Sequence, residues 1–274
     1  MNTKYNEYVL ELRNIHKDFF PGTVDHVKAL RGINLQVRPG DFISIIGSNG
    51  AGKSTALNVV AGVYPPERGG RVLIKGDDVT RLPEYKHSKY VGRVWQDPGI
   101  GTASELSIEE NLSIAVLRGK KRGLRLAVNK KRRQMFKDAL AKLGLGLENR
   151  LSALVGTLSG GQRQALSLIM ATISNPDLLL LDEHIATLDP KTAETVMDMT
   201  DKIIEDENMT ALMVTHNMEK ALKHGNRLIM MHEGRIVLDF DEQKKNSMNG
   251  KDLIGSFIQA SGETFDDDKV LLSR

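Results

Sequence analysis

Cysteine is absent from the 274 residues, which excludes disulfide bonds and metal sites built on thiolates. No apolar run approaches the roughly 20 residues that a transmembrane helix needs. The first residues, Met1–Glu7, carry no apolar core of the kind found in signal peptides. We therefore expect a chain that does not cross a membrane and that would need a partner to work at one.

Aromatic side chains and excess charge are also scarce. Trp95 is the single tryptophan, and we expect it to pack rather than to bind a ligand. Lysine and arginine number 38 against 35 acidic residues, and this mild net charge of +3 gives no case for a nucleic-acid binder. The exception is Arg118–Arg133, which holds nine basic residues and no acid. It is either the solvated tip of a helical hairpin or a contact to anionic lipid or an acidic partner.

The most informative segment that is present fits the pattern G-x-x-x-x-G-K-[ST] of a phosphate-binding P-loop. An apolar strand, Phe42–Ile46, comes before it, and a helix over Ser54–Ala61 follows and ends at Gly62. We expect Lys53 to reach the β- and γ-phosphates and the Ser54 hydroxyl to bind Mg²⁺. The predicted phosphate-binding residues are Gly47, Ser48, Asn49, Gly50, Ala51, Gly52, Lys53, Ser54 and Thr55.

A second apolar strand, Leu178–Leu181, is followed directly by two acids. Ligands in open α/β sheets bind beyond the carboxyl ends of the strands. We expect Asp182 to hold Mg²⁺, directly or through water. Glu183 is then placed to polarise the water that attacks the γ-phosphate.

A second candidate anion site comes before the apolar helix Ala165–Thr172. Ser159 and Gln162 have the spacing of a capping box, and Gly160 and Gly161 lie between them. The turn is either a flexible helix start or a site where backbone N–H groups bind a γ-phosphate. Two phosphate sites and one P-loop suggest a nucleotide that is shared between two chains.

The remaining pattern predicts how the chain is organised. Tyr8–Arg13, Ile33–Val37 and Arg71–Lys75 read as strands of a small antiparallel layer. From about Leu106 to Leu154 the periodicity is helical, and strand–helix alternation resumes after Pro176.

Six motifs in this order and spacing, between Tyr8 and Asp239, resemble the ATP-binding subunit of an ABC transporter. They are Walker A at Gly47–Thr55, the Q-loop glutamine Gln96, the signature Leu158–Gln162, Walker B at Leu178–Glu183, the D-loop Leu188-Asp189 and the switch histidine His216.

The resemblance implies an α/β fold with a P-loop NTPase core, an antiparallel β-subdomain and an inserted helical subdomain. We expect the ATPase domain over residues 1–243, with the helical subdomain at about 97–165, and a short, weakly packed C-terminal extension over 244–274. The resemblance also implies ATP and Mg²⁺ as cofactors. A head-to-tail dimer would enclose one ATP between Lys53 of one chain and Ser159 of the other.

The family also assigns roles to single residues. Gln96 would bind Mg²⁺ and link the attacking water to the membrane partner, and His216 would contact the γ-phosphate and hold the water and Glu183 in place. Asp189 would belong to the shared nucleotide site, and Phe19 would stack on the adenine, with Phe20 as the alternative. His184 departs from the common family pattern, and we expect it to fill space beside Glu183.

Among ABC proteins, the sequence favours a transporter subunit. Ribosome-acting members carry two cassettes in one chain, and chromosome ATPases carry long coiled coils, whereas this chain has one cassette and a short insertion. The segments Gln96–Thr102, Asp182–His184 and Asp189–Ala193 resemble importer ATPases linked with tryptophan and other aromatic amino acids. The expected partners are a permease and an extracellular binding protein, at the cytoplasmic face of the cell membrane. An exporter ATPase is the alternative.

Overall fold

The computed structural model describes residues 7–120 and 128–261, which fall into two compact units, each described here by itself. The first unit runs to His87 and resumes at Asn208, and the second lies between them, from Ser88 to Glu207. None of the helices in the described ranges is long and apolar enough to cross a membrane.

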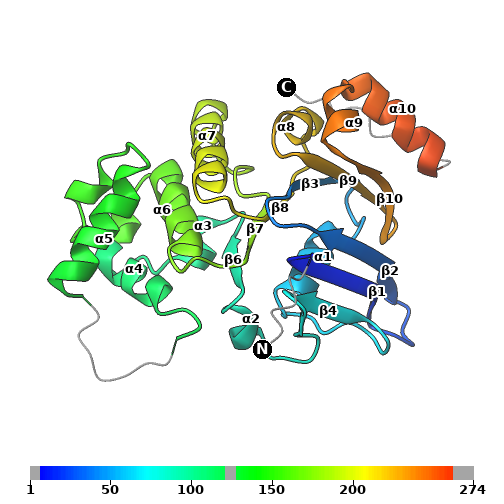
Figure 1. Ribbon diagram of the computed structural model, residues 1–274, viewed down its shortest axis with the longest axis horizontal. Helices are drawn as coiled ribbons and strands as arrows, with labels where there is room; N and C mark the ends of the chain where they lie inside the picture. The colour runs from blue at the N-terminus through cyan, green and yellow to red at the C-terminus, as the bar shows by residue number, and fades with distance from the viewer. Residues whose placement is uncertain (1–6, 121–127, 262–274) are drawn as a thin grey trace. The chain divides into compact units, whose positions relative to one another are not determined.

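One sheet of the first unit is antiparallel, with the strand order β2-β1-β4-β5 (Figure 1). The predicted antiparallel layer is therefore present, although β1 and β2 extend beyond the predicted strands and pair as far as Phe19 opposite Val27. In the added pairs the side chains of Ile15 and Leu30 are buried, while those of Val27 and Lys28 are exposed, as an antiparallel sheet with one solvated face permits. The elements are β1 (Leu10–Phe19), β2 (Val27–Val37), β4 (Arg71–Ile74), β5 (Asp77–Asp78) and the short helix α2 (Glu84–His87).

The other strands of the first unit have the order β10-β9-β3-β8. The fully buried β3 runs parallel to both neighbours, and Ile45 pairs with Val214, so β3 and β8 end at one edge. The turn between β9 and β10 falls at Glu233-Gly234, whose positive φ angles of 43° and 76° suit a tight hairpin. The elements are β3 (Phe42–Ile46), α1 (Lys53–Val60), β8 (Ala211–Val214), α8 (Met218–Lys223), β9 (Arg227–His232), β10 (Arg235–Phe240), α9 (Glu242–Asn246) and α10 (Gly250–Ser261).

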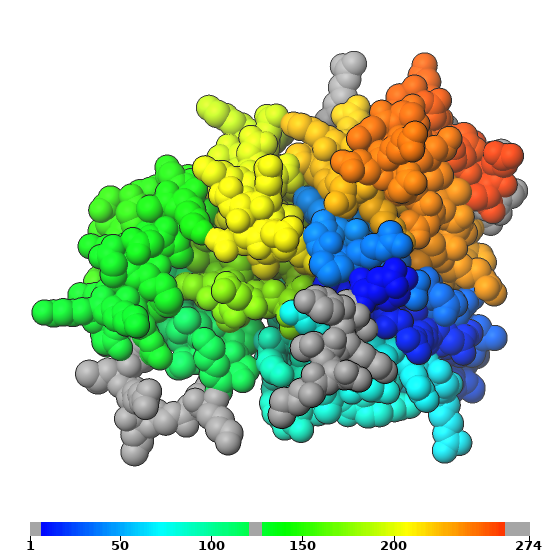
Figure 2. All heavy atoms as spheres, viewed as in Figure 1, coloured from blue at the N-terminus to red at the C-terminus, as the bar shows by residue number. Residues whose placement is uncertain are grey.

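The described part of the C-terminal extension packs firmly, so the prediction that it packs weakly is wrong. Leu253 and Phe257 of α10 are 0% and 2% exposed and join a buried cluster with Ile46 and Met218. Figure 2 shows the orange atoms of α9 and α10 gathered on one face of the first unit. The polar composition misled the prediction, because two apolar residues spaced four apart bury one face of an otherwise polar helix.

A buried lysine fastens α9 to the end of α8. Lys245 is 1% exposed, and its ammonium donates to the carbonyl oxygens of His224 and Gly225. Those carbonyls follow the last turn of α8, where the orphan acceptors of a helix need donors. The extension is therefore bound to the end of α8, the helix whose N-cap, Asn217, follows His216.

The described part of the second unit carries two parallel strands, five α-helices and two 3₁₀ turns. Val94 pairs with Leu181, so β6 and β7 also end at one edge. Helix α6 packs closely against β6 at Gly92. A Cβ at that position would lie 2.3 Å from the carbonyl oxygen of Ala171. The helices α4 and α5 fall in the region predicted to be helical. The elements are β6 (Val91–Val94), α3 (Pro98–Gly101), α4 (Ile108–Val116), α5 (Lys130–Ala141), the 3₁₀ turns η1 (Leu147–Asn149) and η2 (Val155–Thr157), α6 (Gly160–Thr172), β7 (Leu178–Asp182) and α7 (Pro190–Asp206).

Candidate nucleotide site

The glycine-rich turn between β3 and α1 leaves no room for side chains at two positions. A Cβ at Gly47 (φ 151°) would lie 2.1 Å from the carbonyl oxygen of Met231. A Cβ at Gly52 (φ 95°) would lie 2.5 Å from the carbonyl oxygen of Ala29. Only glycine fits such positions, so the turn is shaped by backbone that packs directly against it.

Lys53 makes this turn electropositive. Its side chain is 6% exposed, and its ammonium donates to the carbonyl oxygens of Gly47 (2.7 Å) and Ser48 (3.0 Å). Helix α1 begins at Lys53 with Gly52 as its N-cap, which has no side chain to accept from the first N–H groups. An ammonium and the N–H groups of a helix start around one loop are suited to phosphate oxygens. Ser54, in the same first turn, is exposed.

The first unit also brings His216 to the edge where the P-loop leaves β3. The N–H of Thr215 donates to Ile45 (3.1 Å), which continues the β3–β8 pairing to the last residue before the histidine. Asn217 then caps α8 by accepting from the Lys220 N–H (2.8 Å). His216 is exposed in the short loop between these two fixed points.

The two candidate adenine-stacking residues differ in environment. Phe19 is half-buried, and its ring meets that of Tyr64 edge to face with 5.2 Å between centroids. Phe20 is 66% exposed and has a positive φ of 51°. Phe19 is therefore the more firmly packed aromatic residue, and Phe20 the more accessible one.

In the second unit, the Q-loop and Walker B residues follow two neighbouring parallel strands. Gln96 comes two residues after β6, and its side chain is exposed. The carbonyl of Gln96 accepts from the Thr187 hydroxyl (3.4 Å), and that of Trp95 accepts from the Gln164 amide (3.0 Å). Sequence reasoning missed Gln164 and Thr187. The sequence did offer a signal for Gln164, which is a polar residue within the apolar helix α6. In the structure Gln164 is 1% exposed.

Asp182 ends β7 and forms an ion pair that the sequence did not predict. Its Oδ2 accepts from the Arg93 guanidinium at 2.6 Å, and the two side chains are only 14% and 9% exposed. A carboxylate this far from water needs a positive partner. Its oxygen is also the type of ligand that Mg²⁺ prefers.

Glu183 has a left-handed backbone, with φ at 47°. This conformation costs a non-glycine residue about 1–3 kcal/mol, and such residues gather at functional sites. The next side chain, His184, is 1% exposed, and its Nε2 lies 3.3 Å from the Thr200 hydroxyl of α7. Its burial agrees with the expected packing role.

The signature turn forms the capping box predicted at the start of α6. The Ser159 hydroxyl accepts from the Gln162 N–H (3.3 Å), and the Gln162 side chain accepts from the Ser159 N–H (3.2 Å). Ser159 and Gly160 are both exposed. The turn is therefore ordered by its own hydrogen bonds and open to solvent.

Asp189 is the exposed N-cap of α7 and accepts from the Thr192 N–H at 3.1 Å. Hydrogen bonds from Thr192, of which the side-chain contribution is largest, hold the pKa of Asp189 below its usual value. The carboxylate therefore stays charged at neutral pH.

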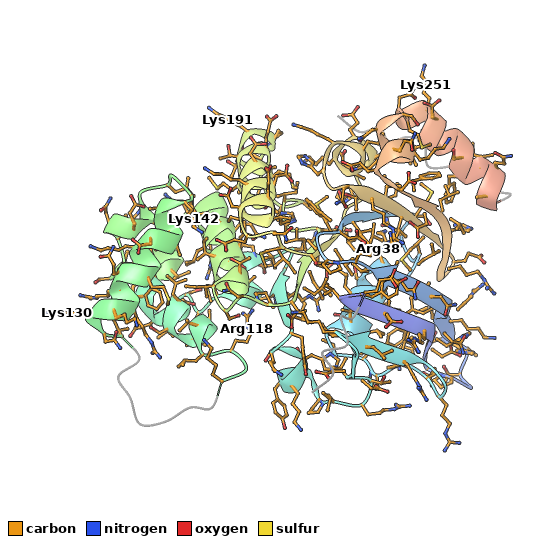
Figure 3. The ribbon with its side chains drawn as sticks, in the orientation of Figure 1. Arg38, Arg118, Lys130, Lys142, Lys191 and Lys251 are labelled. Atoms are coloured by element: carbon orange, nitrogen blue, oxygen red, sulfur yellow. The ribbon has the colours of Figure 1, made fainter. Side chains whose placement is uncertain are left out.

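The two ends of the basic stretch are bound within the second unit. Arg118 donates to the carbonyl oxygen of Ala171 (3.4 Å), and burial lowers the pKa of its guanidinium. Arg133 binds both carboxylate oxygens of Glu109, at 2.6 and 2.7 Å. Figure 3 labels Arg118, and also Lys130 and Lys142 at the two ends of α5. Residues 121–127 of this stretch lie outside the described ranges.

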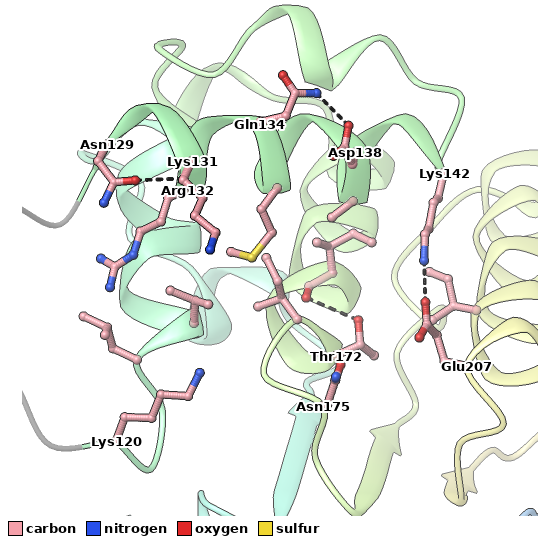
Figure 4. A pocket seen from close by; sticks show the side chains of 17 residues that line it. Lys120, Asn129, Lys131, Arg132, Gln134, Asp138, Lys142, Thr172, Asn175 and Glu207 are labelled. Carbon is pink, nitrogen blue, oxygen red and sulfur yellow. Dashed lines mark hydrogen bonds and ion pairs between the residues drawn. The ribbon is translucent and has the colours of Figure 1, made fainter.

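A hollow of about 790 Å³ lies beside α5 in the second unit (Figure 4). Apolar side chains such as Met135 and Ile169 line it, with Lys131 and the Lys142–Glu207 ion pair also among its lining residues. None of the predicted site residues lines it, so it is not the candidate nucleotide site.

Comparisons with known proteins agree with these motifs. The ABC transporter family model matches residues 30–186. A tyrosine transport ATP-binding protein of Clostridioides difficile is 41% identical over 252 residues, which cover 92% of this chain and 100% of that protein. A methionine import ATP-binding protein of Enterococcus faecalis is 36% identical over 233 residues, 84% of this chain and 64% of that protein.

Among solved structures, the dimeric ATP-binding cassette MJ0796 in a post-hydrolysis state with ADP and phosphate matches with a TM-score of 0.72. It is 28% identical, and the match covers 85% of this chain and 98% of that one. The likeness confirms the predicted fold class, a P-loop NTPase core with an antiparallel β-subdomain and an inserted helical subdomain.

Proposed function

We propose that this chain, which belongs to the ABC transporter family as an ATP-hydrolysing subunit, powers the import of an amino acid. The proposed substrate is an aromatic amino acid. The observation that carries the proposal is the 41% identity to a tyrosine transport ATP-binding protein over that protein's full length. The methionine import relative supports the direction of transport. The partners would be a permease and an extracellular binding protein, with this chain peripheral at the cytoplasmic face of the membrane.

The proposed site uses the P-loop for binding and Glu183 for chemistry. Backbone N–H groups and Lys53 would hold the phosphates, while Glu183 would accept a proton from the attacking water. His216 lies at the strand edge from which the P-loop departs, which supports its proposed contact with the γ-phosphate. Phe19 is the proposed adenine platform.

Mg²⁺ would be held by Ser54, Asp182 and Gln96. A hydroxyl, a carboxylate and an amide oxygen are hard ligands of the kind this ion takes, so the residues fit it. The ion would supply neutralisation of charge on the phosphates.

We further propose a head-to-tail dimer in which the signature turn of one chain meets the nucleotide on the P-loop of the other. Ser159 and Gly160 are exposed at the start of α6, which leaves them accessible to a second chain. The MJ0796 cassette, a solved structure similar to this chain, is itself dimeric. Gln162 and Asp189 would line the same shared site.

Substitution of the P-loop lysine tests the nucleotide site. Lys53→Ala should lower ATP hydrolysis roughly 10²–10³-fold, because it removes the charge aimed at the phosphates. Lys86→Ala, an exposed lysine of α2, is the matched control and should hydrolyse ATP normally. If Lys53→Ala were as active as wild type, the P-loop assignment would be wrong.

Transport direction and substrate are tested in vesicles that hold the chain, its permease and ATP inside. With the binding protein and labelled tyrosine, tryptophan or phenylalanine outside, we expect ATP-dependent uptake of at least one of them. Uptake of methionine alone would replace the aromatic substrate. ATP-dependent movement in the opposite direction, without need of a binding protein, would establish the exporter alternative.

A further inference from the structure

The ion pair between Arg93 and Asp182 joins two neighbouring strands at the edge where the proposed site lies. Arg93 is on β6, one residue before its end, and Asp182 is the last residue of β7. The guanidinium NH2 lies 2.6 Å from Oδ2, with both side chains almost removed from water. The carboxylate assigned to Mg²⁺ is therefore already neutralised by a cation of its own unit.

The same guanidinium lies over the ring of Trp95. Its central carbon is 3.5 Å from the ring centre, which is the geometry of a strong cation–π contact. Trp95 directly precedes Gln96, and its carbonyl is held by Gln164 of α6. Arg93 thus connects the acid at the end of β7 with the segment that carries the Q-loop glutamine.

We propose that Arg93 is a displaceable counter-ion of Asp182, a positioning residue that holds the carboxylate until Mg²⁺ with nucleotide takes it over. The inference rests on the proposed role of Asp182 as a metal ligand. A nearly buried carboxylate without a cation is costly, so Arg93 stabilises the site before the metal binds. Two cations near one carboxylate repel each other, so Arg93 must also weaken metal binding and be drawn off the carboxylate when it occurs.

The displacement has a built-in reporter, because Trp95 is the only tryptophan of the chain. Removal of the guanidinium from its ring changes the surroundings of a single fluorophore with no background from others. Addition of Mg²⁺ to the protein with a non-hydrolysable ATP analogue should therefore change the tryptophan emission in a saturable way. The analogue with a chelator in place of Mg²⁺ should change it much less.

Substitution of Arg93 distinguishes the role of a displaceable counter-ion from that of an ion pair that only holds β6 and β7 together. In Arg93→Met the Mg²⁺-dependent emission change should be lost. The analogue should require at least roughly fivefold less Mg²⁺ for half-saturation, because no competing cation then lies at the carboxylate. Arg93→Lys keeps the charge without the planar stacking group. Its emission change and its Mg²⁺ requirement should lie between those of wild type and of Arg93→Met. Arg235→Met, on the exposed face of β10, is the matched control and should behave as wild type.

Thermal unfolding supplies a readout independent of activity. Arg93→Met should melt below wild type without Mg²⁺, and the difference should shrink when Mg²⁺ and the analogue are present. An equal loss under both conditions, with an unchanged Mg²⁺ requirement, would mean that the pair is only structural and would overturn the proposal. If Arg93→Met does not fold, the same comparison is made with Arg93→Lys.

Binding of the labelled analogue to wild type, measured by equilibrium dialysis, distinguishes failure of the proposed function from failure of the proposed role of Arg93. If wild type binds no nucleotide, the proposed function fails and the role of Arg93 fails with it. If wild type binds Mg²⁺ and analogue while Arg93→Met shows the same Mg²⁺ dependence and emission change, only the role of Arg93 is overturned.

Discussion

The two glycine-rich turns of this chain begin helices of similar appearance, but their own units constrain them to different degrees. At Gly47 and Gly52 a Cβ would collide with backbone carbonyl oxygens at 2.1 and 2.5 Å. At Gly160 the nearest atom to an added Cβ is a Leu188 methyl at 3.6 Å, which is ordinary contact. Gly161 is intermediate, because its Cβ would lie 2.3 Å from the Thr192 methyl, the end of a side chain rather than backbone.

The difference shows which glycines are required by the packing of their own unit and which are not. The first turn needs glycine to keep its backbone conformation, since carbonyl groups of Ala29 and Met231 lie where side chains would be. The second turn does not need Gly160 for its own packing, and the residue is exposed. A missing side chain at an open helix start leaves space for a ligand or a second chain, which supports the proposed shared site.

The largest effect is expected at Glu183, which belongs to neither turn. Glu183→Gln should lower ATP hydrolysis roughly 10²–10⁴-fold, because the amide keeps the size of the side chain but cannot accept the proton of water. Nucleotide binding should persist, so an ATP-bound dimer should accumulate in size-exclusion chromatography. Glu205→Gln, on the exposed face of α7, serves as control. Near-normal phosphate release by the Glu183 variant would mean that another group activates the water.

The support beneath the first turn is tested at Phe257. The side chain is 2% exposed, packs in one cluster with Ile46 and meets the His232 ring edge to face at 5.2 Å. Phe257→Ala should reduce the free energy of unfolding by about 3–5 kcal/mol through the cavity it leaves.

Hydrogen exchange should show that the loss of stability in Phe257→Ala affects the helix after the P-loop and not the helix after the signature turn. Amides of α1 should lose protection in Phe257→Ala, while those of α6 should keep theirs. Ile258→Ala changes the neighbouring residue, which is 38% exposed, and should have a much smaller effect on stability. Uniform loss of protection over both helices would contradict the idea that α10 supports the P-loop in particular.

A matched pair of alanine substitutions measures the comparison directly. Gly47→Ala should cost about 2–4 kcal/mol of unfolding free energy, since the backbone must move to relieve the collision. Gly160→Ala should stay within about 0.5 kcal/mol of wild type in urea unfolding, yet weaken ATP-driven dimerisation of the Glu183→Gln background. A large stability loss at Gly160 would show that the second turn is constrained by its own fold after all.

How much of this could be predicted from the sequence depends on the range of the interaction. The P-loop, the Ser159 capping box and the Asp189 cap were predictable because each is decided by a few adjacent residues. The Arg93–Asp182 pair was not, since its partners are 89 positions apart and meet only when β6 and β7 pair. The positive φ of Glu183 likewise depends on distant packing that carries no local signal. The spacing of Leu253 and Phe257 in α10 is visible in the sequence, but it does not show that they would pack against Ile46 and Met218.

The subtlest prediction asks whether the second turn acts across the dimer. Ser159→Arg should block closure by placing a bulky cation at the signature, while nucleotide binding survives because Lys53 and Ser54 are intact. Mixed with Lys53→Ala, it forms head-to-tail pairs in which one site carries both defects and the other carries neither. Random pairing then leaves roughly a quarter of all sites intact, so a sedimenting ATP-dependent dimer should appear that neither variant forms alone. If each chain used its own signature, both sites of every mixed pair would be damaged and mixing would recover nothing.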